Sequence, residues 1–189
     1  MTTNVSEVLE ELRVDHRNLS VLINMLDAEA DRLKALEDPD YELLRDIMVY
    51  MTSYPDVVHH RKEDWVYARM VAVRPAMERD LRRIGREHAE LAKLGTKLLN
   101  DVEAIESGTV MRRFDVVEDT RQYVNRQRDH MRWEDEKLFP LIDSLKEELD
   151  LGEAAPRVGT MPDPVFGANV ESDFRNLFDA IEREQASRS

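Results

Sequence analysis

Two stretches, His59-His60-Arg61-Lys62-Glu63 and His130-Met131-Arg132-Trp133-Glu134, decide the fold that we predict for this chain. Each contains the pattern His-x-x-x-Glu, which places an imidazole and a carboxylate one turn apart on the same face of a helix. Two of the remaining histidines, His16 and His88, stand in the apolar stripes of other amphipathic segments. Four predicted helices therefore each supply at least one potential metal ligand.

Apolar residues recur at three- and four-residue steps along four stretches, at about residues 5 to 36, 41 to 73, 76 to 106 and 110 to 149. Asp38-Pro39-Asp40 and Ser107-Gly108-Thr109 separate neighbouring stretches. Pro55, four residues before His59, should kink or locally unwind the second helix. Long helices with short connections predict an all-α fold, an up-down-up-down antiparallel four-helix bundle that brings four histidines to a common depth.

The sequence pattern changes after residue 150. Prolines and glycines predict an irregular strap at Gly152, Pro156, Gly159, Pro162, Pro164 and Gly167. Residues 173–184 then predict one short amphipathic helix. We expect the bundle in residues 1–150 and a C-terminal extension in residues 151–189 that packs on the bundle or mediates association.

Composition excludes several classes of protein. The chain has 189 residues, of which 42% are hydrophobic, and a formal net charge of -13. That charge argues against nucleic acid or an anionic membrane as a partner, because both favour a basic face. The chain contains no cysteine, so disulfides and zinc-thiolate sites are excluded. It shows neither a signal peptide nor a run of eighteen apolar residues, and we expect a cytoplasmic protein.

The histidines and glutamates indicate a metal site. Imidazoles and carboxylates are costly inside a bundle unless they are paired or bound to metal. The candidate ligands are His16, His59, Glu63, His88, His130 and Glu134. A mixed nitrogen and oxygen set without sulfur suits iron, manganese or zinc rather than calcium or magnesium. A pair of ions bridged by the two glutamates, with two imidazoles on each, leaves room for an oxo, hydroxo or exogenous ligand.

A purely structural interpretation competes for each residue taken alone. A single histidine on an apolar stripe is more often a satisfied core residue, and one His-x-x-x-Glu is a common helix pair. The order His, His-x-x-x-Glu, His, His-x-x-x-Glu, one per helix, favours metal binding.

The order and spacing of these residues resemble the hemerythrin-like, or HHE cation-binding, domain family in its bacterial form, over about residues 5 to 149. The stretch from Tyr54-Pro55 to Glu63-Asp64 is especially typical of it. The resemblance implies a non-haem di-iron centre with two iron ions per chain, oxo- or hydroxo-bridged. It places His16 and His59 on one iron, His88 and His130 on the other, and the glutamates between them.

The chain departs from the oxygen-carrying hemerythrins at two places. Those proteins have a second histidine one turn from the third-helix ligand, where Ile84 and Ala92 stand here, and an aspartate where Glu134 stands. One iron therefore keeps an extra open position or takes a different donor, which argues against reversible oxygen carriage.

Tyr54 is our candidate for that donor and for a catalytic role, because the Pro55 kink could swing its phenol towards the site. The alternative is a core tyrosine that bonds a backbone carbonyl. His60 faces about 100° away from His59 on a regular helix, so we expect it to be solvated or to support a ligand. A register that uses His60 and Asp64 instead is possible but poorer in apolar neighbours. Glu87 and Asp135 are expected to be solvated or to support ligands.

We predict a protein that reacts with small oxidants, hydrogen peroxide or nitric oxide, with catalase-like or peroxidase-like activity in oxidative or nitrosative stress. The alternative is a reversible binder or sensor of oxygen or iron without turnover, with the C-terminal helix reporting the state of the site. A third possibility is a purely structural bundle. The sequence leaves the oligomeric state open.

Overall fold

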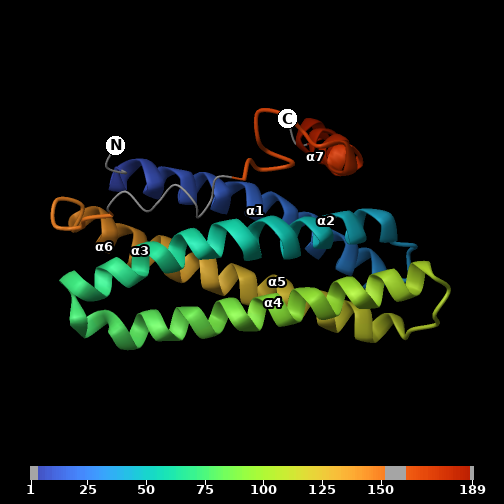
Figure 1. Ribbon diagram of the computed structural model, residues 1–189. Helices are drawn as coiled ribbons and strands as arrows, with labels where there is room; N and C mark the ends of the chain where they lie inside the picture. Colours follow the sequence, from blue (N-terminus) through green and yellow to red (C-terminus); the bar gives the residue numbers. More distant parts are fainter. Residues whose placement is uncertain (1–3, 152–160, 188–189) are drawn as a thin grey trace.

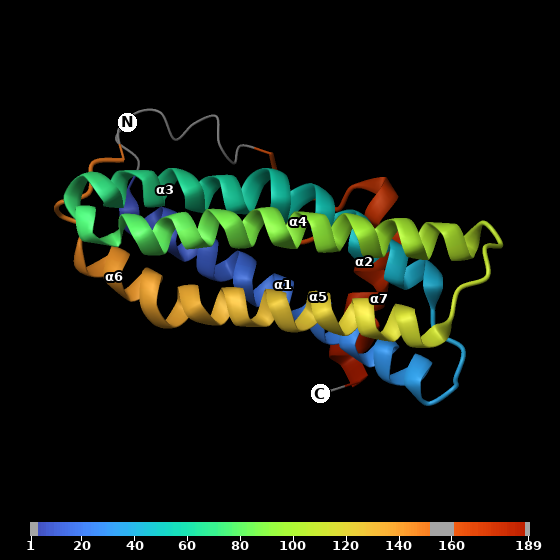
Figure 2. The same cartoon turned by 90° about the horizontal axis from the view of Figure 1, so that it is seen from below.

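The computed structural model describes residues 4–151 and 161–187, and its main body is four helical arms that lie side by side (Figure 1). The arms are α1 (Val5–Lys34); α2 (Tyr41–Tyr54) with the π-turn η1 (Pro55–His59) and α3 (His60–Val73); the 3₁₀ turn η2 (Pro75–Met77) with α4 (Glu78–Glu106); and α5 (Arg113–Trp133) with the π-turn η3 (Glu134–Leu138) and α6 (Phe139–Ser144). Successive arms run in opposite directions (Figure 2). The predicted antiparallel four-helix bundle is confirmed.

Helix ends follow local backbone conformation and differ from prediction by a few residues. The first helix ends at Lys34, because Leu36 takes a left-handed conformation (φ 63°). The third arm ends at Glu106, before Gly108, whose φ of 91° suits glycine. The last arm is shorter than predicted: it starts at Arg113 and turns away after Ser144.

Two π-turns interrupt the α-helical pattern next to the candidate ligands. Pro55 has no N–H and its ring clashes with the preceding turn, so the chain widens there and the N–H of His60 bonds to the carbonyl of Pro55. The second π-turn begins at Glu134, whose carbonyl accepts from the N–H of Phe139, just before Pro140. The expected disturbance at Pro55 is thus a wider turn that ends at His59.

A polar layer divides the apolar core into two clusters. One cluster contains Leu19, Leu22, Ile23 and Leu26 of α1 together with residues of α2, α4, α5 and α7. The other contains Val5, Val8, Leu9 and Leu12 of α1 together with residues of α3, α4 and α6. His16 lies between the two groups of α1 residues, and the other candidate ligands occupy the same level of their own helices. The apolar clusters therefore hold the polar layer from both sides.

The C-terminal helix α7 (Arg175–Ser187), preceded by the 3₁₀ turn η5 (Ser172–Phe174), crosses the bundle against α2 (Figures 1 and 2). Leu177 and Ile181 of α7 are buried in the first cluster. The Tyr50 hydroxyl donates to Asp163 Oδ2 (2.9 Å), which ties the chain before α7 to α2. Residues 152–160 of the predicted strap lie outside the described residues.

Across the described residues, none of the helices is both long enough and apolar enough to span a membrane.

Candidate metal centre

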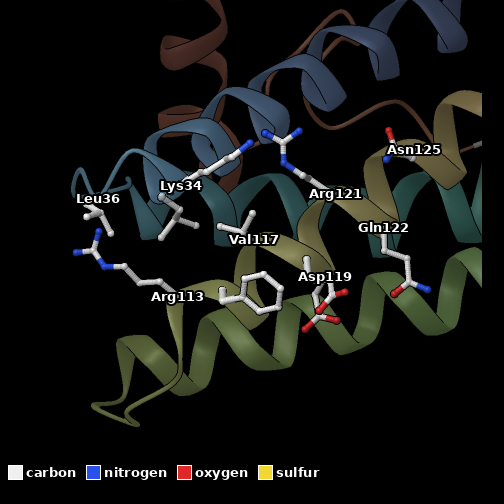
Figure 3. A pocket seen from close by; sticks show the side chains of 11 residues that line it. Lys34, Leu36, Arg113, Val117, Asp119, Arg121, Gln122 and Asn125 are labelled. Atoms are coloured by element: carbon white, nitrogen blue, oxygen red, sulfur yellow. The ribbon is translucent and has the colours of Figure 1, made fainter.

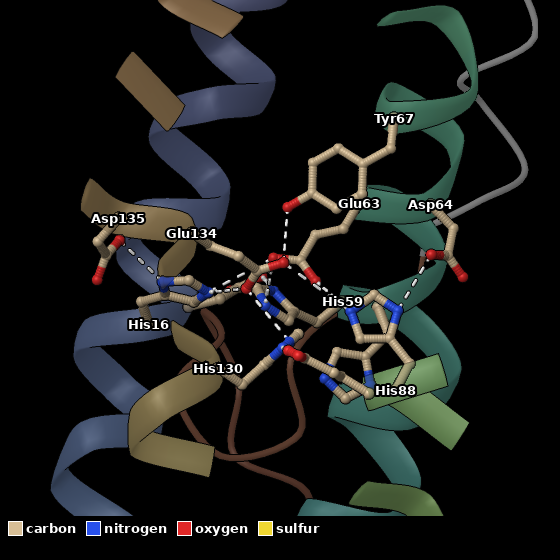
Figure 4. Close-up of polar contacts among 12 residues, drawn as sticks. His16, His59, Glu63, Asp64, Tyr67, His88, His130, Glu134 and Asp135 are labelled. Carbon is tan, nitrogen blue, oxygen red and sulfur yellow. Dashed lines mark hydrogen bonds and ion pairs between the residues drawn. The ribbon is translucent and has the colours of Figure 1, made fainter. Parts of the chain in front are cut away.

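The six predicted ligands meet in the polar layer (Figure 4), and each is at most 7% exposed. Glu63 lies between imidazoles of different helices. Its Oε1 is 3.2 Å from His59 Nε2 and 3.5 Å from His16 Nε2, while its Oε2 is 3.4 Å from His88 Nε2. The two oxygens of one carboxylate therefore face two separate groups of imidazoles.

Glu134 occupies the corresponding position on the fourth arm. Its Oε2 is 3.3 Å from His130 Nε2 and 3.6 Å from His16 Nε2, and its Oε1 is 3.9 Å from His88 Nε2. Each glutamate thus lies near one imidazole of its own arm and near the imidazoles of the first and third arms. This is the arrangement expected of carboxylates that can be shared between two cations.

Each of the four predicted imidazole ligands donates a hydrogen bond to a carboxylate outside the layer. The Nδ1 donors and their acceptors are His16 to Asp135 (2.9 Å), His59 to Asp15 (3.0 Å), His88 to Asp64 (3.0 Å) and His130 to Glu87 (3.2 Å). A carboxylate at Nδ1 fixes the ring orientation and leaves Nε2 free for a metal. All four imidazoles are therefore held with Nε2 directed at the two glutamates.

These outer carboxylates reveal an internal repeat that the sequence analysis missed. Asp15-His16 in the first arm corresponds to Glu87-His88 in the third, and Glu63-Asp64 corresponds to Glu134-Asp135. Asp15 and Glu87 each precede a predicted ligand and accept a hydrogen bond from the histidine of the following arm. Asp64 and Asp135 each follow a glutamate and likewise accept from a histidine of a neighbouring arm. The sequence signal for this repeat is an acidic residue next to a predicted ligand at the same position in each half. It can be seen only when the two halves of the sequence are aligned with each other.

Several buried polar atoms of the layer have no hydrogen-bond partner. They are the Nε2 atoms of His16, His60, His88 and His130, both carboxylate oxygens of Glu63, and Oε2 of Glu134. An unsatisfied buried polar group costs about 1–3 kcal/mol, and a charged one costs more. Two sets have ligand atoms within 4.8 Å of one another: His60, Glu63, His88 and His130, and His16, His59 and Glu63. Nitrogen and oxygen donors without sulfur fit iron, manganese or zinc.

His60 is not solvated, so one of the two expectations of the sequence analysis is wrong; the other, a supporting role, stays a prediction. It is 4% exposed and lies inside the layer, with its ring stacked on that of His88 at 4.2 Å. The regular helix used for the prediction does not apply here, because the π-turn of residues 55–59 ends directly before His60. All five histidines of the chain therefore gather at one level.

The phenol that reaches the glutamates belongs to Tyr67, which the sequence analysis did not single out. Its hydroxyl donates to Glu134 Oε1 at 2.7 Å. Tyr67 stands one turn after Glu63 on the ligand face of α3, and that spacing could have identified it. Tyr54 is 8% exposed, and its ring stacks on Tyr50 at 5.7 Å.

The electrostatics of the layer connect metal binding to protons. Burial lowers the pKa of His16, but the hydrogen bond to Asp135 and the nearby charges of Glu63 and Glu134 outweigh it and raise the pKa to about 10. Burial and the charge of Glu63 raise the pKa of Glu134 to about 7. Against the effect of burial, the pKa values of His59 and His88 are raised as well, chiefly by Glu63 and by their outer carboxylates, so protons on these imidazoles can balance the buried carboxylates. A cation that binds the same nitrogens displaces those protons, so its affinity rises with pH.

A surface hollow lies at the end of the bundle where α1 joins α2 and α4 joins α5 (Figure 3). Leu36, Arg113, Phe114 and Val117 are among the residues that line it. None of the ligands or their outer carboxylates lines this hollow, so it is not an opening into the polar layer.

We expect Asp135→Asn to weaken metal binding by about 10–100-fold, because an amide oxygen accepts the His16 Nδ1–H more weakly than a carboxylate does. Competition with a chelator of known affinity measures the effect. Glu136→Gln is the matched control, since it removes the same charge from the next residue, which is exposed. Equal affinities of the two variants would show that Asp135 acts only through its charge.

Comparison with known proteins agrees with this geometry. Residues 7–142, more than half of the chain, match the family model of the hemerythrin HHE cation-binding domain. The chain has no match among curated proteins or among solved structures. The family and the buried histidine–glutamate groups together make this a metal-binding protein, for which iron is the fitting metal. On the match and the bundle that carries it, the chain belongs to the hemerythrin HHE cation-binding family.

Proposed function

We propose that this chain is a non-haem di-iron protein that reacts with hydrogen peroxide or nitric oxide. The observation that carries the proposal is the position of Glu63 and Glu134, each within 4 Å of imidazoles from different helices. Two cations, one beside His16 and His59 and one beside His88 and His130, would satisfy the unpartnered nitrogen and oxygen atoms of the layer.

The residues of the chain have separable tasks at such a centre. The imidazoles and the two glutamates would hold the ions, and the outer carboxylates keep the imidazoles in position. The two apolar clusters exclude bulk water from both sides of the layer. When bound, iron supplies the exchange of electrons with a small oxidant.

Tyr67 gives the centre a group that retains its proton. Burial, followed by the nearby charge of Glu134, raises the pKa of the Tyr67 hydroxyl well above its usual value. The hydroxyl therefore stays neutral and can hold a proton 2.7 Å from Glu134 Oε1. A hydroxyl with so high a pKa acts as a hydrogen-bond donor rather than as a source of protons, so Tyr67 can hold Glu134 in position for a metal.

The third arm supports reaction over reversible oxygen carriage. Ile84 and Ala92, one turn on either side of His88, offer no donor, and Ile84 is fully buried. The absence of a donor at these two positions supports the open or altered coordination that the sequence analysis predicts.

The second candidate function is a sensor or reversible binder of oxygen or iron. One contact favours it: Asp163, which precedes α7, accepts from Tyr50, one turn before Tyr54 and the π-turn that carries His59. A change at His59 could pass along this path to the C-terminal helix. Reversible spectral change with oxygen and slow autoxidation would support this candidate.

We expect iron-loaded protein to contain about two irons per chain and the double variant His59→Ala, Glu63→Ala to lose them, because the variant removes one imidazole and the carboxylate whose two oxygens face both groups of imidazoles. Elemental analysis measures the content. Metal-loaded protein should also unfold at a higher temperature than the metal-free form, since metal binds only the folded state. Arg61→Ala, an exposed change on the same turn, is the control. A wild-type chain without stoichiometric metal would contradict the di-iron proposal.

We expect iron-loaded protein to remove hydrogen peroxide or consume nitric oxide in a steady-state assay. Zinc-loaded protein is the matched control, because zinc can occupy nitrogen and oxygen donors but undergoes no redox change. Absence of both reactions in fully iron-loaded protein would eliminate the proposed reactivity.

The role predicted for Tyr54 as donor or gate has a spectroscopic test. A phenolate on ferric iron gives a visible absorption band, so Tyr54→Phe should abolish that band and Tyr67→Phe should retain it. A band that persists in Tyr54→Phe would assign this tyrosine to packing against Tyr50 instead.

A further inference from the structure

We infer that His60 is a fifth imidazole ligand, on the ion held by His88 and His130, where it supplies the imidazole that the third arm lacks. This inference rests on the proposed di-iron centre and extends it. The π-turn of residues 55–59 makes it possible, because it allows two consecutive histidines to lie in one layer.

The position of His60 relative to the other candidate ligands is the first support. Its ring stacks on His88 with centroids 4.2 Å apart and planes 11° apart, and it meets His130 edge-on at 5.7 Å. One potential ligand atom from each of His60, Glu63, His88 and His130 lies within 4.8 Å of the others. A single cation can therefore be reached by all four side chains.

The hydrogen-bonding state of the ring is the second support. Nδ1 of His60 lies 3.2 Å from Asp56 Oδ1, one turn earlier, while Nε2 is buried with no partner. This is the pattern of His16, His88 and His130: a carboxylate at Nδ1 and an unpartnered Nε2. A histidine that serves only as packing has no reason to leave a buried nitrogen unsatisfied, because that costs free energy.

A fifth imidazole makes the centre asymmetric. The internal repeat gives His60 a counterpart at Met131, which directly follows His130 and has no comparable donor. The ion at His88 and His130 then has three imidazoles, and the ion at His16 and His59 has two. The side of the layer with His16 and His59 would offer fewer imidazoles to a cation, and it is there that we expect a small oxidant to bind.

The test uses Co²⁺ as the probe and nuclear magnetic resonance as the readout. An imidazole that binds Co²⁺ through Nε2 keeps an exchangeable N–H at Nδ1, and the paramagnetic ion shifts its resonance out of the ordinary range. We expect five such resonances in the fully loaded wild-type protein. Four resonances would overturn the inference.

Two variants separate ligation from packing. His60→Phe keeps a ring against His88 but removes the nitrogen, so we expect four resonances and an affinity for one of the two ions that is reduced by at least about tenfold. His60→Ala should show the same loss, and added imidazole should restore it. Wild-type affinity for both ions in His60→Phe would assign His60 to packing.

The outcomes distinguish this inference from the proposed function. Five resonances would support ligation by His60. If the iron-loaded protein of the same chain reacts with neither peroxide nor nitric oxide, the proposed reactivity is contradicted while the ligation stands. Failure of the wild-type chain to bind Co²⁺ at all would overturn the ligand, and iron analysis of the same preparation then decides the di-iron proposal separately.

Discussion

The structure depends on the burial of two carboxylates and five imidazoles in one layer of a helical bundle. Such groups are stable in an apolar core only when opposite charges, hydrogen bonds or a cation compensate them. Here each histidine has a carboxylate at Nδ1, and the inner nitrogens converge on Glu63 and Glu134. The remaining unpartnered atoms are those that a metal would bind. Ligand geometry and fold stability are therefore parts of the same requirement.

The layer is built twice from the same parts, with one difference. Each half of the chain contributes an acid-histidine pair on one arm and a His-x-x-x-Glu-Asp pattern on the next. The two halves contact each other through Asp64, which accepts a hydrogen bond from His88, and Asp135, which accepts one from His16. His60 has no equivalent in the second half, where Met131 stands. A symmetric scaffold thus carries an unequal number of buried imidazoles in its two halves.

The parts around the layer decide how rigid and how accessible it is. The two apolar clusters fix the four arms above and below it, so that the imidazoles are held before any metal arrives. The C-terminal helix joins one of these clusters and covers α2 near Tyr50. The extension, which lies outside the family match, therefore packs on the arm that carries His59.

The sequence by itself determined the bundle and the six histidines and glutamates that meet in its polar layer. Apolar periodicity and the i, i+4 spacing of His59 with Glu63 and of His130 with Glu134 are local properties of a helix, and they can be recognised without knowing what packs against it. Only the tertiary structure decided the place of His60, the role of Tyr67 and the pairing of each histidine with its outer carboxylate. The π-turn at Pro55 changes the direction of side chains relative to a regular helix, and contacts between arms depend on how the helices are aligned along the bundle. The periodicity of a single helix contains neither the direction of side chains after the π-turn nor the alignment of one arm against another. These features could therefore be seen only in the folded chain.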